Sequence, residues 1–395
     1  MRTNPGGQLA PENVVGRSRE VEYLWRVLED QSVYIHAERR IGKTSVLTLL
    51  DSDVRQGWAS KLRDLESVHT AEEFAARVYR DIEPFLRSRK RAQRRFAKAA
   101  GTLSGVEIAG VLKLPSGEPV PWKDVLEACA RDLADAFDHN GDRLLLLWDE
   151  VPFMLGNIAR RQDEEVAMEV LDTLRYLRQT YPCLRMVLTG SIGLHHVLTQ
   201  LRRVGYANAP VNDMESFELQ PLRPDDGTEL ARALLTGEQI DADDADQIAA
   251  LVSSAVDHFP YYIHHLVREL QRRAQPVNAP AVDRALAELL IASSDPWELQ
   301  HYRKRIKTYY GPDEAVVLAI LDAIATGPRT HDEAFAIAKS VVATDDKEHV
   351  RDLLTAMQRD HYIRRGAGAH FDFSYGLIRR WWRLERGIEA EQGKP

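Results

Sequence analysis

Residues 37–44 have the types and spacing of a loop that binds the phosphates of a nucleotide. They follow the apolar run 33–35, which predicts a strand leading into the loop. Small residues let successive backbone N–H groups turn toward the β- and γ-phosphates, and a helix N-terminus adds partial positive charge. Gly42 would supply that freedom, Lys43 would reach the phosphate oxygens, and the Thr44 hydroxyl would ligate Mg²⁺. The sequence therefore predicts binding of a nucleoside triphosphate with Mg²⁺.

The other residues of this loop are expected to surround the same phosphates. They are Ala37, Glu38, Arg39, Arg40 and Ile41. Ala37 stands where glycine is commoner in such loops. Because alanine fits there only where φ is negative, we expect a somewhat stiffer loop than usual.

A pair of carboxylates ends a second apolar segment further along the chain. Residues 143–148 form a nearly continuous apolar run, which is typical of a strand buried on both faces of a parallel sheet. Asp149 and Glu150 follow it, at the strand end where open α/β sheets bind their ligands. Asp149 would hold Mg²⁺ through water, and Glu150 would orient and polarise the attacking water. The alternative is a buried strand that merely ends in acidic residues, and the phosphate loop argues against it.

Small polar residues end another predicted strand at 185–191. If this strand belongs to the same sheet, Thr189 or Ser191 would lie near the γ-phosphate and hydrogen-bond it or the attacking water. In the alternative interpretation, residues 189–191 simply turn the chain. The sequence leaves both interpretations open.

These residues require a sheet with helices packed around it. Strands are expected at 33–35, 61–65, 143–148, 185–191 and 216–220, and amphipathic helices at 21–28, 45–50, 74–82, 126–137 and 166–177. Pro84 is expected to kink the third of these helices. Residues 106–114 predict a short hairpin between core elements. The alternation over residues 14–221 predicts an α/β fold with a parallel sheet covered on both faces.

Length, charge and cysteine usage exclude several classes of protein. At 395 residues the chain should form two or three domains, and its net charge of −8 argues against attraction of the whole molecule to nucleic acid. Cys129 and Cys183 lie in separate apolar segments and suggest no disulfide framework, which favours the cytoplasm. The N-terminus is polar and no run reaches the length of a membrane span, so neither secretion nor membrane insertion is expected.

A local basic patch nevertheless occurs at residues 87–98. Its cations recur at helical spacing, namely Arg87, Arg91, Arg94, Arg95 and Lys98. Such a face would neutralise the phosphates of a nucleic acid, dock an acidic partner such as the segment 241–246, or remain a solvated surface. The sequence leaves these three interpretations open.

From about residue 310 the sequence predicts a compact helical module. Apolar faces at 316–324 and 350–357 mark two helices, and Thr330 to Glu333 have the capping-box form that begins another between them. Residues 362–365 and 370–373 flank a glycine-containing turn, as the two strands of a wing would. This order of elements is that of a winged helix.

The charges of this module favour contact with protein over contact with DNA. Its third helix mixes Lys347 and Arg351 with acidic residues and lacks the cationic bias expected at phosphates. Trp381 and Trp382 are expected to anchor a final helix to the core. The basic run 301–307, which precedes the module, could touch nucleic acid, but such a run is more often a solvated connector.

The motifs together resemble the archaeal-type ATPases, in the STAND-related branch of the AAA+ superfamily. The matching segments are 14–17 with Glu20, 38–45, the strand ending at Asp149 and Glu150, and 188–191. The resemblance implies ATP or ADP with Mg²⁺ as cofactors. It places Gly16 and Arg17 near the adenine and Ser45 in the phosphate loop.

The resemblance also implies a division of the chain. It predicts a flexible tail at 1–13, a P-loop core at 14–222, a helical lid at 223–291, a linker at 292–311 and a winged-helix domain at 312–395. The family's lid carries a Gly-x-Pro motif against the base. Here Pro260 is kept, but His258 replaces the glycine.

Members of that branch resemble regulated switches, which implies a homo-oligomer and an arginine supplied by a neighbouring copy. Arg202 and Arg203 stand where such proteins often place that arginine, which would stabilise charge on the transferring phosphoryl group. The alternative is a surface pair at a helix end.

Two functions from different classes follow. The first is an ATP-binding and ATP-hydrolysing switch with a protein partner. The second is a DNA-binding, initiator-like ATPase that uses the winged helix and the basic helix 87–98. The overall acidity and the mixed charge of the third helix favour the first.

Overall fold

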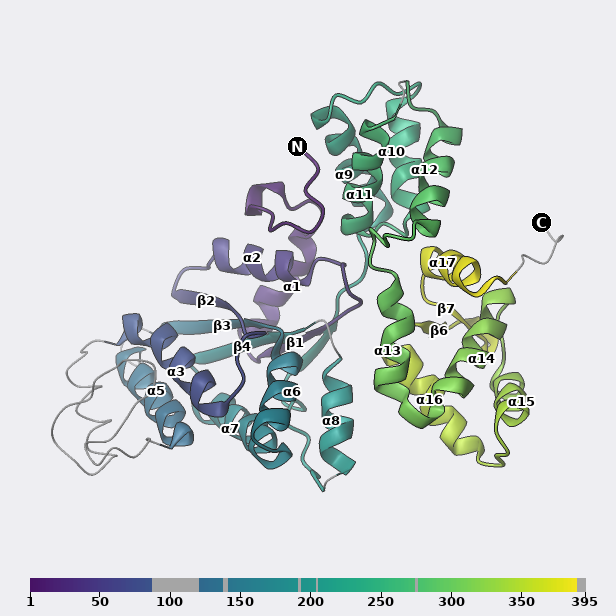
Figure 1. Cartoon of the computed structure of the whole chain (residues 1–395). Coiled ribbons are helices and arrows are strands. Elements are labelled where there is room, and N and C mark those ends of the chain that lie inside the picture. Colours follow the sequence, from purple (N-terminus) through teal and green to yellow (C-terminus); the bar gives the residue numbers. More distant parts are fainter. Residues whose placement is uncertain (87–120, 138–140, 191–192, 204, 274–275, 389–395) are drawn as a thin grey trace. The chain divides into compact units, whose positions relative to one another are not determined.

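The chain forms two compact units. The computed structural model describes residues 1–86, 121–137, 141–190, 193–203, 205–273 and 276–388, with the backbone alone at 203 and 367 (Figure 1). The sheet unit comprises residues 18–37 and 43–219, and the helical unit comprises residues 1–17, 38–42 and 220–395. The predicted basic face 87–98, the predicted hairpin 106–114 and Ser191 lie outside the described residues. No described helix is long and apolar enough to cross a membrane.

Parallel strands form the centre of the sheet unit. They are β1 (Val33–His36), β2 (Trp58–Asp64), β3 (Arg143–Asp149), β4 (Leu184–Thr189) and β5 (Glu215–Glu218). Within the described residues they form one sheet in the order β2-β3-β4-β1-β5, and every neighbouring pair is parallel. The predicted α/β fold with a parallel sheet is confirmed.

Helices cover both faces of this sheet. They are α1 (Ser18–Leu28), α2 (Lys43–Ser52), α3 (Ala71–Ile82), α5 (Trp122–Phe137), α6 (Val151–Arg161), α7 (Glu164–Thr180) and α8 (Leu194–Arg203). Helices α1 and α2 lie on one face, and α3, α5, α6 and α7 lie on the other (Figure 1). The connections between parallel strands therefore place helices on both sides, as crossover connections do.

Strand β3 shows why its sequence is apolar throughout. Leu144, Leu146 and Trp148 belong to the core cluster shared with α3, α5, α6 and α7, and the Trp148 ring packs edge-on against Phe74 with centroids 5.2 Å apart. Leu145 alternates to the opposite face and is equally buried. Both faces of β3 are hidden from water, so no polar residue interrupts the run.

Two local expectations differ from the structure. Helix α6 follows β3 directly, whereas the sequence had predicted the next helix only at 166–177. Pro152 and Gly156 lower the helix propensity of this segment, but proline in the first turn forfeits no helical hydrogen bond. Pro84 does not kink α3, because α3 ends at Ile82 and Pro84 lies in the following short 3₁₀ turn, η2 (Glu83–Phe85).

The first part of the helical unit consists of short helices, two of which have polar side-chain caps. They are η1 (Pro11–Asn13), α9 (Pro224–Gly237), α10 (Ala245–Ala255), α11 (Pro260–Gln271) and α12 (Ala279–Ile291). Asp244 and Asn278 begin α10 and α12 by accepting hydrogen bonds from backbone N–H groups of the first turn. Their buried faces are apolar, as in Ile248 and Val252 of α10.

The remaining elements of this unit follow in one run. They are α13 (Gln300–Tyr310), η3 (Gly311–Asp313), α14 (Glu314–Thr326), α15 (His331–Val341), α16 (Lys347–Arg359), β6 (Ile363–Arg365), η4 (Ala367–Ala369), β7 (Phe371–Phe373) and α17 (Gly376–Arg386). The capping box predicted at Thr330 and Glu333 is present. Strands β6 and β7 pair antiparallel. Trp381 and Trp382 are buried and hold α17, and Trp382 Nε1 donates to Asp322 Oδ1 at 2.8 Å.

Helix α13 contradicts the expectation of a solvated connector at 301–307. Tyr302, Ile306 and Tyr310 recur one turn apart and are buried. Most of the other residues of this segment are basic, so its composition suggests exposure to solvent although three of its residues form a buried face. The helical spacing of the apolar residues, rather than the positive charge of the segment, indicates that one face of this helix is buried.

Candidate functional site

Thr44 and Asp149 meet at the C-terminal edge of the parallel sheet. Thr44 lies in the first turn of α2, and Asp149 is the last residue of β3. The Thr44 hydroxyl donates a hydrogen bond to Asp149 Oδ2 at 2.6 Å. A hydroxyl and a carboxylate are oxygen donors that suit Mg²⁺. The structure thus brings together the two residues predicted to hold the metal.

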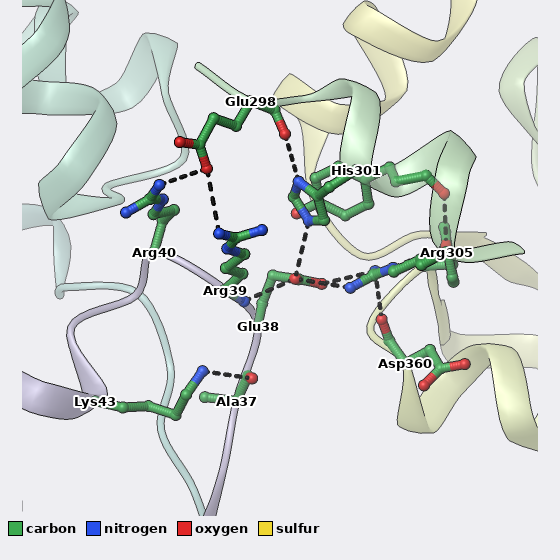
Figure 2. A network of polar contacts seen from close by, with 11 residues as sticks. Ala37, Glu38, Arg39, Arg40, Lys43, Glu298, His301, Arg305 and Asp360 are labelled. Carbon is green, nitrogen blue, oxygen red and sulfur yellow. Dashed lines mark hydrogen bonds and ion pairs between the residues drawn. The ribbon is translucent and has the colours of Figure 1, made fainter. Parts of the chain in front are cut away.

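Lys43 begins α2 and turns back across the loop that precedes it. Its ammonium group donates to the carbonyl oxygen of Ala37 at 3.1 Å (Figure 2). The side chain is largely buried. An arriving phosphate would offer this ammonium a charged acceptor, and charge-assisted hydrogen bonds are about twice as strong as neutral ones.

The loop between Ala37 and Lys43 contains two left-handed residues. Arg40 has φ 68° and Gly42 has φ 102°, whereas Ala37 is not among the positive-φ residues. The Ala37 backbone therefore suits alanine, as the sequence required. The unusual backbone of Arg40 is held by its side chain, which pairs with Glu298 and lies over the Tyr261 ring with the guanidinium carbon 4.3 Å from the centroid.

Glu150 occupies a strained turn between β3 and α6. It has φ 60° and ψ 32°, and its N–H donates to Asp149 Oδ1 at 3.0 Å. Gly190 lies against this turn, since a Cβ built on Gly190 would be 2.5 Å from Pro152 Cδ and 3.5 Å from Glu150 Cα. The missing side chain of Gly190 lets the end of β4 approach Glu150. Glu150 is partly exposed, which suits a group that must meet water.

Thr189 ends β4 beside these residues. Trp148 pairs with Leu188, so Asp149 and Thr189 end neighbouring strands at the same level, and Ile35 of β1 pairs with Thr189 on its other side. Thr189 is fully buried, and its hydroxyl has no hydrogen-bond partner among the described residues. Because a buried hydroxyl without a partner is costly, this position suits a group supplied from outside the chain.

Gly16 and Arg17 lie in the helical unit together with loop residues 38–42. The buried Arg17 guanidinium donates to the Ile41 carbonyl at 2.7 Å and to the Gln220 carbonyl at 2.9 Å. Gly16 has φ 74°, and a Cβ there would be 2.5 Å from Asp226 Cβ, so only glycine fits. The two residues tie the loop to the segment that leads into α9.

Pro260 begins α11 and follows a left-handed His258. His258 has φ 60°, a conformation that glycine favours. Its Nδ1 lies 2.8 Å from the Ser253 hydroxyl, and burial lowers the pKa of the imidazole. Histidine at this position thus adopts a left-handed backbone, the conformation that glycine favours.

Arg202 and Arg203 end α8 in the sheet unit. The Arg202 side chain is exposed. Of Arg203 only the backbone is described. An exposed helix end is a position from which a residue can reach a neighbouring copy of the chain.

Sequence reasoning missed a buried ion pair between Glu38 of the loop and Arg305 of α13. Arg305 Nη1 and Nη2 each donate to one Glu38 carboxylate oxygen at 3.1 Å (Figure 2). Burial alone would raise the pKa of Glu38, but the charge of Arg305, the two hydrogen bonds from Arg305 and the nearby His301 imidazole outweigh it and hold the pKa well below its usual value. An acidic residue in a phosphate-binding loop is a signal, because such a residue needs a cation.

This ion pair predicts a pH-dependent stability. A carboxylate whose pKa is lowered by folding stabilises the protein above its unfolded pKa and loses that contribution as the pH falls below about 4.3. At pH 7, Glu38→Gln should lower the free energy of unfolding by about 3–5 kcal/mol, because Arg305 is left buried and unpaired. The difference in Tm between wild type and E38Q should shrink between about pH 5 and pH 3. A difference that stays constant with pH would contradict this account.

Comparisons with known proteins show similarity in structure but not in sequence. No model of a known protein family matches the chain, and no curated protein matches it. The Walker-type ATPase PABY2304 of Pyrococcus abyssi aligns over 94% of this chain and 97% of its own, with a TM-score of 0.62 and 19% identity. The Aeropyrum pernix ORC2 protein in its ADPNP–ADP complexes aligns over 97% and 96%, with a TM-score of 0.53 and 11% identity. The chain therefore shares its α/β fold with these two proteins.

Proposed function

We propose that this protein is an ATP-binding and ATP-hydrolysing switch of the STAND type, which uses Mg-ATP to control its conformation or its assembly. The contact between the Thr44 hydroxyl and Asp149 at 2.6 Å carries the proposal. These residues come from two distant motifs, and each has the chemistry that a Mg-nucleotide site needs. Mg²⁺ bound there would neutralise phosphate charge.

Each residue of the site has a role in this proposal. Lys43 binds the β- and γ-phosphates as a point charge, and backbone N–H groups at the start of α2 add hydrogen bonds. Glu150 orients the attacking water and accepts its proton. Arg202 or Arg203 of a neighbouring copy completes the charge stabilisation. The ORC2 structure contains ADP and ADPNP, which supports nucleotide as the ligand of this fold.

Thr189→Val is expected to slow ATP hydrolysis without destabilising the protein. The hydroxyl has no partner to lose among the described residues, so Tm should stay unchanged or rise. If the hydroxyl contacts the γ-phosphate or the attacking water, kcat should fall at least about tenfold. Thr173→Val, at a mostly buried position on α7, serves as the control and should leave kcat unchanged. Unchanged turnover in T189V would remove Thr189 from the site.

The function itself is tested by two measurements on the purified chain. ATP turnover is measured first, with and without a protein extract that could contain a partner. Molecular mass is then measured by light scattering in ADP and in ATP. The switch predicts slow turnover and a mass that depends on the nucleotide. Absence of both nucleotide binding and turnover would refute the proposal.

Duplex DNA at two salt concentrations separates the switch from an initiator-like ATPase. Two cations of α16 lie beside carboxylates, since Arg351 pairs with Glu348 and Lys347 lies 3.5 Å from Asp332. This pairing disfavours phosphate contact by α16. Turnover that accelerates with salt-sensitive DNA binding would instead support the initiator-like function.

A further inference from the structure

Glu38 places a carboxylate inside a loop whose proposed ligand is strongly anionic. The Glu38 side chain is fully buried. Its own oxygen also accepts a hydrogen bond from the Arg39 N–H at 2.7 Å, so a donor of the loop backbone is turned toward Glu38. Without compensation, this carboxylate would repel the phosphates of a bound nucleotide.

Arg305 supplies the compensation from a fixed position. Besides its two bonds to Glu38, its Nε donates to the Tyr362 hydroxyl at 2.8 Å and its Nη2 to the Asp360 carbonyl at 2.8 Å. The guanidinium also lies over the Tyr302 and Tyr362 rings, 4.6 and 4.3 Å from their centroids. Because these contacts occupy the guanidinium, Arg305 acts on the loop through its charge rather than by contact with phosphate.

A second contact joins the same two segments. Glu298, which precedes α13, pairs with Arg40 and lies 3.3 Å from Arg39 (Figure 2). The pKa of Glu298 is lowered, because hydrogen bonding and charge from Arg40 outweigh the effect of burial. Three consecutive loop residues, 38–40, are therefore held by the segment 298–305.

We propose that the Glu38–Arg305 pair is an electrostatic latch through which nucleotide in the phosphate loop and attachment of α13 to that loop strengthen each other. The latch rests on the proposed function, because it requires an anionic ligand in the loop. With Arg305 in place, the charge of Glu38 is neutralised and the loop accepts phosphate. Bound phosphate in turn adds negative charge that attracts Arg305.

Thermodynamic linkage requires that the effect of α13 on nucleotide affinity and the effect of nucleotide on the attachment of α13 be equal. If attachment of α13 increases nucleotide affinity by some factor, nucleotide must strengthen the attachment by the same factor. Helix α13 leads directly into η3 and α14. The latch would thus transmit occupancy of the loop to the C-terminal elements of the helical unit.

Nucleotide affinity in charge variants tests the latch. Binding of a fluorescent ATP analogue is measured in Arg305→Met, Arg305→Lys, Glu38→Gln and the double variant E38Q/R305M. R305M should bind at least about tenfold more weakly, because Glu38 is left unpaired. E38Q should bind as tightly as wild type or more tightly, since Arg305 then adds uncompensated positive charge. R305K, which keeps the charge, and the double variant, which removes both charges, should both stay within about threefold of wild type.

Arg303→Met is the matched control on the same helix. Arg303 pairs with Glu314 at 2.8 Å, and among the described residues it makes no polar contact with the loop. R303M should bind nucleotide as wild type does. If R305M fails to fold, E38Q decides the question, because a merely structural pair would make E38Q weaker rather than equal or tighter. Weaker binding in both single variants with no recovery in the double variant would overturn the latch.

Hydrogen exchange tests the reciprocal effect. Adding ATP should slow amide exchange of residues 300–310 in wild type and R303M, but much less in E38Q/R305M. Equal slowing in the double variant would overturn the coupling. Failure of wild type itself to bind ATP would refute the proposed function, whereas binding that is indifferent to both charges would refute only the latch.

Discussion

Lys43→Ala is expected to weaken ATP binding by at least about a hundredfold. Lys43 is 7% exposed, and its ammonium lies across the loop toward the Ala37 carbonyl. Removing one partner of a buried pair of opposite charges costs about 2–5 kcal/mol, and each 1.4 kcal/mol is a tenfold change in affinity. Titration with a fluorescent ATP analogue measures the change directly.

Lys123→Ala is the control for this loss of charge. Lys123 forms an exposed ion pair with Glu169 at 2.6 Å, on helices of the same unit. The control should bind ATP as wild type does, because an exposed pair contributes little. Both variants should be compared in thermal unfolding without nucleotide, so that loss of fold is separated from loss of binding. Unchanged ATP affinity in K43A would reject the role given to Lys43.

Glu150→Gln is expected to keep ATP binding and to lower hydrolysis by about 10²–10⁴-fold, the contribution typical of a general base. Glutamine has nearly the same shape as glutamate but cannot accept a proton at neutral pH. The backbone turn at Glu150, with φ 60°, should tolerate the change because only one side-chain atom differs. Single-turnover measurements separate the chemical step from release of product.

Two results would contradict the assignment of Glu150. Wild-type turnover in E150Q would show that another group activates the water. Loss of ATP binding in E150Q would place the carboxylate in the binding of metal or phosphate rather than in catalysis. Glu164→Gln, in the first turn of α7, removes an exposed carboxylate and should leave both binding and turnover unchanged.

K43A and E150Q together represent the two nucleotide states of the protein, one without ATP and one with ATP bound. K43A reports on the empty site, whereas E150Q should hold ATP without consuming it. If ATP controls assembly, E150Q in ATP should keep the mass of the ATP state, and K43A should show one mass in every nucleotide. Light scattering on both variants therefore tests the switch without measuring turnover.

Local pattern alone was enough to predict the central elements of the sheet unit. The run 143–148 predicted β3, because both faces of that strand are buried and each successive residue from 144 to 148 is therefore apolar. The loop around Lys43 was equally visible, since phosphate binding needs particular residue types at fixed spacing. The capping box at Thr330 and Glu333 was predicted for the same reason, because its two bonds span a single helical turn.

The sequence predictions were wrong in two segments, where helix propensity or charge indicates one structure and the spacing of apolar residues indicates another. Pro152 and Gly156 obscured α6, although its apolar residues Met154, Leu155 and Ile158 are buried. In α13 the basic residues suggested solvent, while Tyr302, Ile306 and Tyr310 form the buried stripe. Propensity and composition are weak terms in such segments, and burial of apolar area in the folded chain decides the outcome.

The sequence by itself determined the candidate phosphate loop, the acidic strand end and the parallel α/β fold that positions them. Only the tertiary structure decided which distant groups neutralise one another. The distance of 2.6 Å between Thr44 and Asp149 depends on how β3 lies beside β4 and β1, and the Glu38–Arg305 pair depends on where α13 meets the loop. Burial of one face of a helix or strand produces a regular spacing of apolar residues, which can be seen in the sequence. The partners of an ion pair attract each other through space and can stand at any separation in the chain, so the sequence does not show which of them will pair.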